Sequence, residues 1–405
     1  MITDSIDIED SSGSKANVAL IANLRKAGFE ITVYHYTRKN ILLDGINCYS
    51  IPEIKFSLNY FISRAQRILQ RKFKIELAPF FEKRFGFSFT FFNDTNSIKK
   101  ALQQSNLAVD LVLTLSKGGS FRPHYAVLQI PEWHSKWIAY IHDPYPFHYY
   151  PRPYNWVEPA YKFKEDFFVK LSEKAKYSAF PSQLLKEWMG SYFPNFLKTG
   201  IIIPHQNAAY SIKNNQFLDY FDASKFNLLH AGNLMKQRNP KALIDGYLLF
   251  LQQNPEAIAE SCLLLIGPAS DHAKLLSNYK NTPELYIANQ NIPFDVIYNL
   301  QQNTAVNVIL EAKSEISPFL PAKFPHCVEA NKPILLLSPY YSETRRLLGD
   351  DYPFWTEADD VDKIAIAIGR LYEIWKKNPN ALQLNRSDLL HYLSASYLKI
   401  AIESL

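Results

Sequence analysis

Residues able to hold an anion are concentrated in one stretch of the second half of the chain, residues 317–326, whose sequence is SPFLPAKFPH. Proline is tolerated in the first turn of a helix, where the N–H groups have no intrahelical partner, so Pro321 and Pro325 predict that a helix begins here. A buried strand is expected at 333–337, after this helix. Because ligands of open parallel sheets bind at the carboxyl edge of the strands, the sequence predicts an anion site formed by the positive end of the helix and the ammonium group of Lys323.

A second predicted anion site lies upstream, where a buried strand at 226–230 ends shortly before Gly232. Two cations, Lys236 and Arg238, follow, and Asn239-Pro240 is typical of the start of a helix. Arg238 could instead be a solvated residue of that start, but cations are disfavoured at the positive end of a helix, which favours a binding role. Two sites of this kind in one half of the chain predict a phosphorylated ligand.

The order and spacing of three motifs carry a family resemblance. The motifs are Ile203-Pro204-His205; Ala231-Gly232-Asn233-Leu234 with Arg238-Asn239-Pro240-Lys241-Ala242-Leu243; and Phe319-Leu320-Pro321-Ala322-Lys323. With them the chain resembles bacterial glycosyltransferases of GT-B type, most clearly over residues 225–375, and within these the retaining family 4-like group that includes many cell-surface polysaccharide enzymes. The resemblance implies an α/β fold with two doubly wound Rossmann-like domains facing a cleft. It also implies transfer of a sugar, with retention, from a nucleoside diphosphate sugar to a lipid-linked or polysaccharide acceptor.

The family's way of stabilising the diphosphate leaving group assigns the first set of site residues. In the resembled family a glycine is followed by an arginine and, a few residues later, by a lysine, because charge develops on the diphosphate as the glycosidic bond breaks. Gly232 matches the glycine, Asn233 stands at the arginine position, and Arg238 stands at the lysine position with Lys236 nearby. The resemblance therefore implies diphosphate binding by these four residues and Lys323, with Arg238 as the main phosphate contact.

The nucleotide ribose and the donor sugar are expected near the first anion site. Relatives carry two glutamates eight residues apart, and here His326 stands at the later position while Ser317 or Pro318 stands near the earlier one. This departs from the family pattern, although histidine can still form a hydrogen bond to a ribose. Glu329, one helical turn after His326, is expected either to share this task or to be an exposed helix residue.

In the first half of the chain, His142 and Asp143 end a predicted buried strand and open an aromatic loop. The resemblance places His142 against the transferred sugar, and Asp143 follows where an acceptor hydroxyl would arrive; Asp before Pro is also a common turn element. We expect both residues to position the substrates first and to transfer protons second. Ser12 and Gly13 are expected to bring backbone close to the acceptor or the diphosphate, with a flexible serine–glycine loop as the alternative.

Short apolar strands alternate with amphipathic helices, which is typical of parallel sheets covered on both faces. We predict an N-terminal acceptor-side Rossmann-like domain at 1–205 and a C-terminal nucleotide-sugar-binding Rossmann-like domain at 206–386. A C-terminal helix at 387–405 is expected to return to the first domain. Strands are predicted at 30–36, 109–115, 137–142, 200–203, 226–230, 262–266, 285–287, 306–310 and 333–337, and helices at 14–27, 164–174, 182–189, 240–252 and 359–377.

The first strand is the one weak element of this pattern. Only residues 1–8 precede the turn that contains Gly13, and their isoleucines lie among polar residues. We therefore predict that most of the first strand is missing because the true start lies upstream, with a short first strand as the alternative. An in-frame run of about six apolar codons upstream would support a missing strand, and a stop codon there would refute it.

The composition limits the class of protein and its partners. The formal net charge of +5 is too small to indicate nucleic acid, and no run of apolar residues reaches membrane-spanning length. Eight cations, two acids and many bulky apolar residues lie between Lys55 and Arg84, which predicts either peripheral contact with an anionic membrane or an ordinary helix pair with a basic face. Three widely spaced cysteines favour a reducing cytoplasm. The expected location is thus cytoplasmic, with peripheral attachment at the inner membrane face left open.

The expected donor is a UDP- or GDP-linked sugar, and no obligatory metal or other cofactor is expected because no Asp-x-Asp element follows an apolar strand. Two other functions stay open. The replacements at Asn233 and His326 favour a non-catalytic GT-B-fold protein that binds a glycan or a partner, and a sugar-nucleotide epimerase would share the two-domain fold. The sequence does not distinguish the base, the sugar, the acceptor or the linkage.

Overall fold

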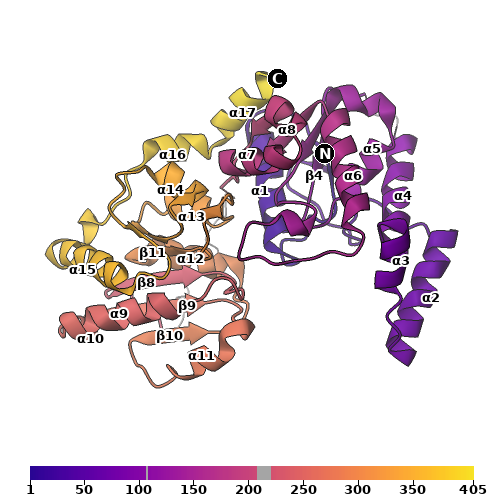
Figure 1. Cartoon of the computed structure of the whole chain (residues 1–405). Helices are drawn as coiled ribbons and strands as arrows, with labels where there is room; N and C mark the ends of the chain where they lie inside the picture. Colours follow the sequence, from indigo (N-terminus) through magenta and orange to yellow (C-terminus); the bar gives the residue numbers. More distant parts are fainter. Residues whose placement is uncertain (106–107, 208–219) are drawn as a thin grey trace. The chain divides into compact units, whose positions relative to one another are not determined.

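The computed structural model describes residues 1–105, 108–207 and 220–405, which form two compact units (Figure 1). Unit 1 holds the described residues of Met1–Tyr150, Tyr154–Ala208 and Ala395–Leu405, and unit 2 holds Pro151–Pro153 and the described residues of Ala209–Ser394. The predicted boundary between the two domains, at residues 205 and 206, is followed closely by residues 208–219, which lie outside the described residues.

Unit 1 is built on a parallel sheet of seven strands in the order β3-β2-β1-β4-β5-β6-β7. The strand order reverses at β1, which pairs with β2 on one side and β4 on the other, so the switch point of a doubly wound sheet lies here. The strands are β1 (Ile2–Thr3), β2 (Thr32–His35), β3 (Asn47–Ser50), β4 (Val112–Leu115), β5 (Trp137–Tyr140), β6 (Tyr177–Phe180) and β7 (Gly200–Ile202).

Four helices of unit 1 begin where a serine side chain binds a free N–H group of the first turn. Ser11, Ser57, Ser88 and Ser182 each accept a hydrogen bond from the backbone three residues later, at the starts of α1, α2, α4 and α7. The helices are α1 (Ser12–Lys26), α2 (Leu58–Phe73), α3 (Ala78–Phe85), α4 (Phe89–Gln104), α5 (Arg122–Leu128), α6 (Tyr161–Lys174), α7 (Gln183–Tyr192), α8 (Asn195–Thr199) and α17 (Ala395–Glu403), with 3-10 turns η1 (Pro131–Lys136) and η2 (Phe147–Tyr149).

Unit 2 contains a parallel sheet of six strands in the order β10-β9-β8-β11-β13-β15, and a small parallel pair, β12-β14. The strands are β8 (Phe226–Ala231), β9 (Ser261–Ile266), β10 (Leu285–Ala288), β11 (Val306–Leu310), β12 (Ile316–Ser317), β13 (Ile334–Leu337), β14 (Tyr341–Ser342) and β15 (Trp355–Thr356). The helices are α9 (Lys241–Gln253), α10 (Ala257–Glu260), α11 (Ala273–Ser277), α12 (Phe294–Asn303), α13 (Phe324–Glu329), α14 (Glu343–Leu348), α15 (Val361–Lys377) and α16 (Ser387–Tyr392), with η3 (Ser270–His272) and η4 (Pro379–Ala381).

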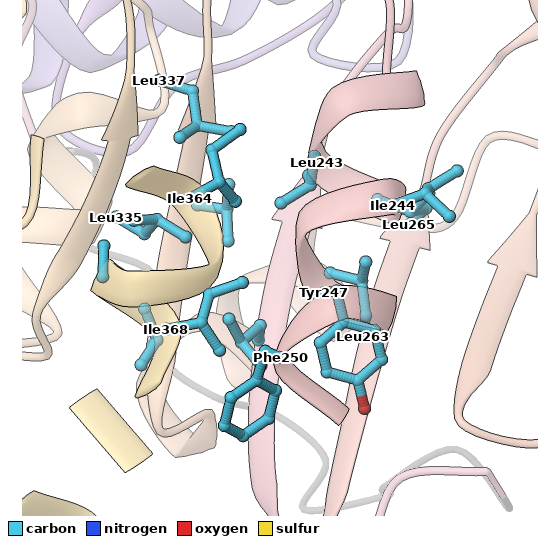
Figure 2. Close-up of a cluster of buried hydrophobic side chains, with 14 of the residues drawn as sticks. Leu243, Ile244, Tyr247, Phe250, Leu263, Leu265, Leu335, Leu337, Ile364 and Ile368 are labelled. Carbon is cyan, nitrogen blue, oxygen red and sulfur yellow. The ribbon is translucent and has the colours of Figure 1, made fainter. Parts of the chain in front are cut away.

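The largest core of unit 2 lies between its sheet and the helix pair α9 and α15. Figure 2 shows Leu243, Tyr247 and Phe250 of α9 and Ile364 and Ile368 of α15 over the leucines of β9 and β13, and all of these side chains are buried. A Cβ on Gly246 would come within 2.5 Å of the Ile364 side chain, so the missing side chain lets the two helices approach closely. This packing holds the strands whose carboxyl ends carry the predicted anion sites.

The predicted elements are present, with ends that differ by a few residues. Strand 306–310 has the predicted ends; β5 stops at Tyr140, before His142, and α9 starts at Lys241 rather than Pro240. The first strand is the two-residue β1. The predicted return segment 387–405 divides in the structure, because α16 packs against α13 in unit 2 whereas α17 packs on α1 in unit 1.

Candidate functional site

The carboxyl ends of β8 and β9 approach closely in unit 2, and glycine makes this approach possible. The backbone N–H of Gly232 donates to the carbonyl of Ile266, and that of Gly267 donates to the carbonyl of Ala288. The segments after β8 and β9 therefore each leave the sheet beside the end of the next strand. Gly267 has φ +136°, and a Cβ there would lie 2.4 Å from the carbonyl oxygen of Gly232. Gly232 itself has φ +152°. Both positions therefore require glycine, and the backbone of Gly232 is exposed to whatever lies at this edge.

Lys323 brings a cation to the same place from a distant part of the chain. It occupies the N-cap position of α13, and its Nζ lies 3.5 Å from Nδ1 of His230 in β8. A Cβ on Gly232 would lie only 3.0 Å from this Nζ. The structure thus brings together the two sequence motifs that predicted anion binding, with Lys323 directly over Gly232.

The surroundings lower the pKa of both Lys323 and His230. Burial, aided by the positive charge of Arg238 and opposed by Cys327 and Glu311, lowers the pKa of Lys323 to about 7. Burial, followed by the charges of Lys323 and Arg238, lowers the pKa of His230 well below its ordinary value. Since a nearby anion favours the charged form of each group, a phosphate at this edge would offset these effects.

Arg238 and a buried carboxylate complete the group. Glu311 follows β11, and its Oε1 accepts hydrogen bonds from the hydroxyls of Ser342 and Thr344, at 3.1 and 2.7 Å. Burial raises the pKa of Glu311. These two hydrogen bonds, a third from Ser317 and the charge of Arg238 oppose this effect in part. Nε of Arg238 is buried and has no hydrogen-bond partner among the described residues. The site therefore combines three basic groups with one carboxylate behind them.

The other residues predicted for the donor lie in different surroundings. Asn233 and Lys236 are exposed, and Ser317 is buried and bonds to Glu311; Pro318 is buried as well. The ring of His326 is buried edge-on against Phe294 and Tyr298 of α12, with centroids 5.2 and 5.8 Å away. Glu329 accepts a hydrogen bond of 2.9 Å from the Tyr298 hydroxyl. His326 and Glu329 thus both contact Tyr298, as expected for residues three apart on one helix.

In unit 1, His142 is held from α1 and β4. Its Nε2 lies 2.8 Å from Oδ1 of Asn17, and its backbone N–H donates to Ser116 Oγ. The Asn17 amide nitrogen donates to the Ser116 carbonyl and to Thr3 Oγ1, which fixes Oδ1 as the acceptor for the ring. His142 therefore carries its proton on Nε2. Burial, together with the neighbouring His205 and His124, lowers its pKa well below the ordinary value.

Asp143 turns to the aromatic loop, and Ser12 and Gly13 form a helix. The Asp143 side chain forms a hydrogen bond with Tyr150, whose pKa is raised, first by burial and then by this carboxylate. Ser12 and Gly13 are the first two residues of α1 rather than a flexible loop. A Cβ on Gly13 would lie 3.2 Å from Cγ of Lys117, so glycine admits that side chain. His142 and α1 are linked through Asn17.

Sequence reasoning did not identify His230, Glu311 or Asn17 as site residues. The first two had a signal, because each is a polar residue near the end of, or directly after, a strand that is mostly apolar, as in VNVIL-E. Asn17 had none, since its role depends on the fold of α1 over β4. Among the described residues no group of three or more histidine, cysteine or acidic side chains could hold a metal ion, and none of the helices described is both long and apolar enough to cross a membrane.

Comparisons with known proteins fit the fold. No protein-family model and no curated protein sequence matches the chain. Solved structures match over its whole length: the trehalose-6-phosphate synthase OtsA (TM-score 0.65, 13% identity, 98% of that chain) and a UDP-forming trehalose-phosphate synthase from Burkholderia xenovorans with glucose-6-phosphate (0.66, 9%, 98%). Anabaena Alr3699/HepE, in complex with UDP and glucose, matches with a TM-score of 0.59, 12% identity and 97% of that chain covered. The predicted GT-B fold of two parallel-sheet, Rossmann-like units is thereby confirmed, while the family 4-like group stays a prediction.

Proposed function

We propose that the chain is a glycosyltransferase that moves a sugar from a UDP- or GDP-linked donor to a lipid-linked or polysaccharide acceptor, with retention, in cell-surface glycan synthesis. The observation that carries the proposal is the placement of Lys323 against His230 and Gly232 at the carboxyl edge of the unit 2 sheet. Structures of the same fold contain a nucleotide and sugars, UDP with glucose in one and UDP-2-fluoro glucose in another. These support a nucleoside diphosphate sugar as the ligand of this edge.

The chemistry of the edge suits a diphosphate leaving group. As the bond between the sugar and the diphosphate breaks, negative charge grows on the β-phosphate oxygen, and preorganised cations stabilise it. The fork of Arg238 would bind phosphate oxygens bidentately. Lys323, whose pKa is about 7 in the free protein, would take up a proton from solvent when the donor binds and so be charged as the bond breaks. The backbone N–H groups after Gly232 would complete the binding of the anion.

We assign the acceptor side of the reaction to unit 1. His142, held neutral by burial and oriented by Asn17, would position the transferred sugar through hydrogen bonds rather than act as a strong acid. Asp143, anchored by Tyr150, would position an acceptor hydroxyl. The first turn of α1, with Ser12 and Gly13, would place its free N–H groups near the diphosphate or the acceptor.

Calorimetric titration with UDP, GDP, ADP and CMP tests the donor site. We expect one diphosphate to bind and Arg238→Ala and Lys323→Ala each to weaken it about tenfold or more, the loss typical of a hydrogen bond to a charged group. Lys280→Ala, which removes an exposed lysine of unit 2, is the matched control and should bind like the wild type. Unchanged nucleotide affinity in both site variants would refute the proposed site.

A second function, a non-catalytic protein that binds a glycan or a partner, is favoured by one observation. The position expected to bind the ribose holds His326, whose ring is packed against Phe294 and Tyr298, and the nearby Glu329 is bonded to Tyr298. A transferase should release nucleoside diphosphate only when acceptor is added, whereas an epimerase should convert the donor sugar alone. Nucleotide binding without either reaction would favour the non-catalytic function.

We also propose that α2 and α3 rest on an anionic membrane surface. Figure 1 shows these helices extending from the rest of unit 1. Ser63 is the one residue of α2 that is buried, and large apolar side chains are exposed along the segment: Phe56, Leu58, Phe61, Ile68, Phe73, Ile75, Phe80 and Phe85. A cavity of about 460 Å³ beside them is lined by three cations and one acid, Arg67, Arg71, Lys74 and Glu76, together with Gln70, and the excess of cations suits a lipid phosphate. Bulky apolar groups among cations are typical of interfacial helices.

Sedimentation with lipid vesicles tests this surface. The wild type should sediment with vesicles rich in phosphatidylglycerol and much less with pure phosphatidylcholine, and added salt should weaken the binding. The triple variant Phe56→Ser, Phe61→Ser, Phe80→Ser should stay in the supernatant. Val157→Ser removes an equally exposed apolar side chain outside these helices and should behave like the wild type. Equal sedimentation of the triple variant and the wild type would exclude the proposed contact.

A further inference from the structure

Two nitrogen atoms of unit 2 converge on the point where a Cβ of residue 232 would lie. A Cβ there would be 3.0 Å from Nζ of Lys323 and 4.0 Å from Nε2 of His230. Gly232 has a φ of +152°, a conformation that other residues rarely adopt, so no side chain comes between the two nitrogens and the backbone. An amine from α13 and a ring from β8 therefore face the same piece of backbone.

The polar groups around this point have few partners. His230 is 1% exposed, and its Nε2 has no hydrogen-bond partner among the described residues. Nε of Arg238 is also buried and unpartnered within the described chain. Nζ of Lys323 has Nδ1 of His230 within reach, at 3.5 Å, the limit of hydrogen-bond distance. Buried polar groups are normally hydrogen-bonded, so these donors favour a ligand that carries acceptor oxygens.

The surroundings also make Lys323 a nucleophile. Burial is the main reason that its pKa falls to about 7; the charge of Arg238 lowers it further, while Cys327 and Glu311 oppose this. At neutral pH about half of such an amine is unprotonated, compared with less than about one in a thousand for a lysine in water. Burial and a neighbouring cation are the two ways in which proteins activate a lysine amine for attack on a carbonyl carbon.

A reactive amine beside anion-binding donors selects one class of reagent. An acyl phosphate carries both a phosphate, which can accept from Arg238, and a carbonyl carbon, which the amine can attack. A neutral ester has no charge for the guanidinium to bind, and a nucleoside diphosphate has no acyl carbon. When the phosphate is held at this edge, the carbonyl lies beside Nζ, and a bimolecular reaction becomes effectively unimolecular.

We propose that Lys323 is acylated by acyl phosphates that bind beside Gly232 and Arg238. The lone pair of Nζ forms a bond to the carbonyl carbon, and the bond from that carbon to the bridging oxygen breaks. The phosphate leaves with the electron pair of this bond and takes up the proton that Nζ loses, so the product is a neutral amide. The acylation itself needs only the anion site; its consequence, loss of donor binding, rests on the proposed function.

Peptide mass spectrometry of the full chain after incubation with acetyl phosphate tests the proposal. Lys323 should be acetylated at least about tenfold faster than the exposed Lys280. Arg238→Ala should slow the reaction at Lys323 about tenfold, the loss typical of a hydrogen bond to a charged group, and exposed Arg370→Ala is the matched control. Because Arg238→Ala also changes the pKa of Lys323, the same samples are treated with p-nitrophenyl acetate, a neutral acyl reagent that shares the pKa effect but carries no phosphate.

Two results would overturn the proposal. One is equal acetylation of Lys323 and Lys280 in the wild type. The other is an Arg238→Ala variant that slows both reagents by the same factor, since the phosphate would then make no contact with the arginine. If this variant does not fold, competition decides: inorganic phosphate should slow acetyl phosphate but leave p-nitrophenyl acetate unaffected, and equal effects on both would refute phosphate binding.

Titration with UDP before and after acetylation separates this proposal from the proposed donor site. Wild-type protein that binds UDP and loses about tenfold or more in affinity once Lys323 is acetylated would support both. Selective acetylation in a protein that does not bind UDP would support the acylation and refute the donor site. UDP binding without selective acetylation would refute the acylation alone.

Discussion

The Nζ atom of Lys323 and the Nδ1 atom of His230 lie 3.5 Å apart, although the two residues are 93 positions apart in the chain. The same Nδ1 lies 3.3 Å from the carbonyl oxygen of Val308. A protonated Nδ1 would donate to Val308, whereas an unprotonated one would accept from the ammonium group of Lys323. Whether Nδ1 carries the proton of the ring therefore depends on the charge of Lys323. An anion that attracts the ammonium group changes both the charge of the lysine and the position of the ring proton.

The affinity for nucleoside diphosphate should fall as the pH rises above about 7, the pKa of Lys323 in the free protein. Above this pH the amine is largely neutral, and a bound diphosphate favours the ammonium form, so binding takes up a proton. Affinity should then fall by up to about tenfold per pH unit. Calorimetry in buffers of different ionisation enthalpy measures this proton uptake directly. Lys323→Met should abolish it, and a slope that persists in this variant would assign the proton to another group.

Substitution of Gly232 should separate backbone strain from loss of binding. Gly232→Ala places a Cβ 3.0 Å from Nζ of Lys323 at a φ of +152°, so the lysine must move. Gly28→Ala is the matched control, because its φ is +101° but a Cβ there meets nothing within 4 Å. Each change should cost about 1–3 kcal/mol in the free energy of unfolding. Calorimetric titration should show weaker UDP binding for Gly232→Ala alone; equal UDP affinity in the two variants would mean that Lys323 does not touch the nucleotide.

The parallel-sheet fold could be predicted from the sequence because its strands are continuous apolar runs. Leu263–Ile266 of β9 and the four residues of β13 are buried on both faces of the sheet. Such apolar runs between amphipathic helices are compatible with few folds other than a parallel sheet covered on both sides. The short edge strands were not predicted. In β3 most residues are exposed, and β12 and β14 have two residues each, so these strands depend on their neighbours rather than on their own pattern.

The candidate site could be predicted only in part, for a similar reason. Gly232 and Lys323 stand in motifs whose backbone requirements are local, and the structure brings them together. The contact of Lys323 with His230, and that of Asn17 with His142, join residues 93 and 125 positions apart. Spacing along the chain carries no information about such pairs. They follow from the order of the strands in each sheet.

Acid should destabilise unit 1 through His205. Burial lowers the pKa of His205 to about 4, and the ring stacks on His142, with centroids 5.4 Å apart. Between about pH 6.5 and 4 the unfolded chain protonates His205 and the native chain does not, so stability falls as the pH falls. In His205→Gln the free energy of unfolding should change less steeply with pH over this range, by about 1.4 kcal/mol per pH unit. Urea unfolding at several pH values measures the slope, with exposed His391→Gln as the control; equal slopes in the two variants would show that His205 is charged when folded.

The C-terminal helix α17 should contribute to the stability of unit 1 through one face only. Leu398 is fully buried in the cluster that contains Leu20, Ile21 and Leu24 of α1, whereas Ile400, two residues later, is 60% exposed. Leu398→Ala leaves a cavity in this cluster and should cost about 2–5 kcal/mol. Ile400→Ala should change stability by less than about 0.5 kcal/mol, since its side chain remains in water. Urea unfolding followed by tryptophan fluorescence, to which Trp137 in the core of the same unit contributes, compares the two variants. Equal stabilities would mean that α17 is not docked on α1 in solution.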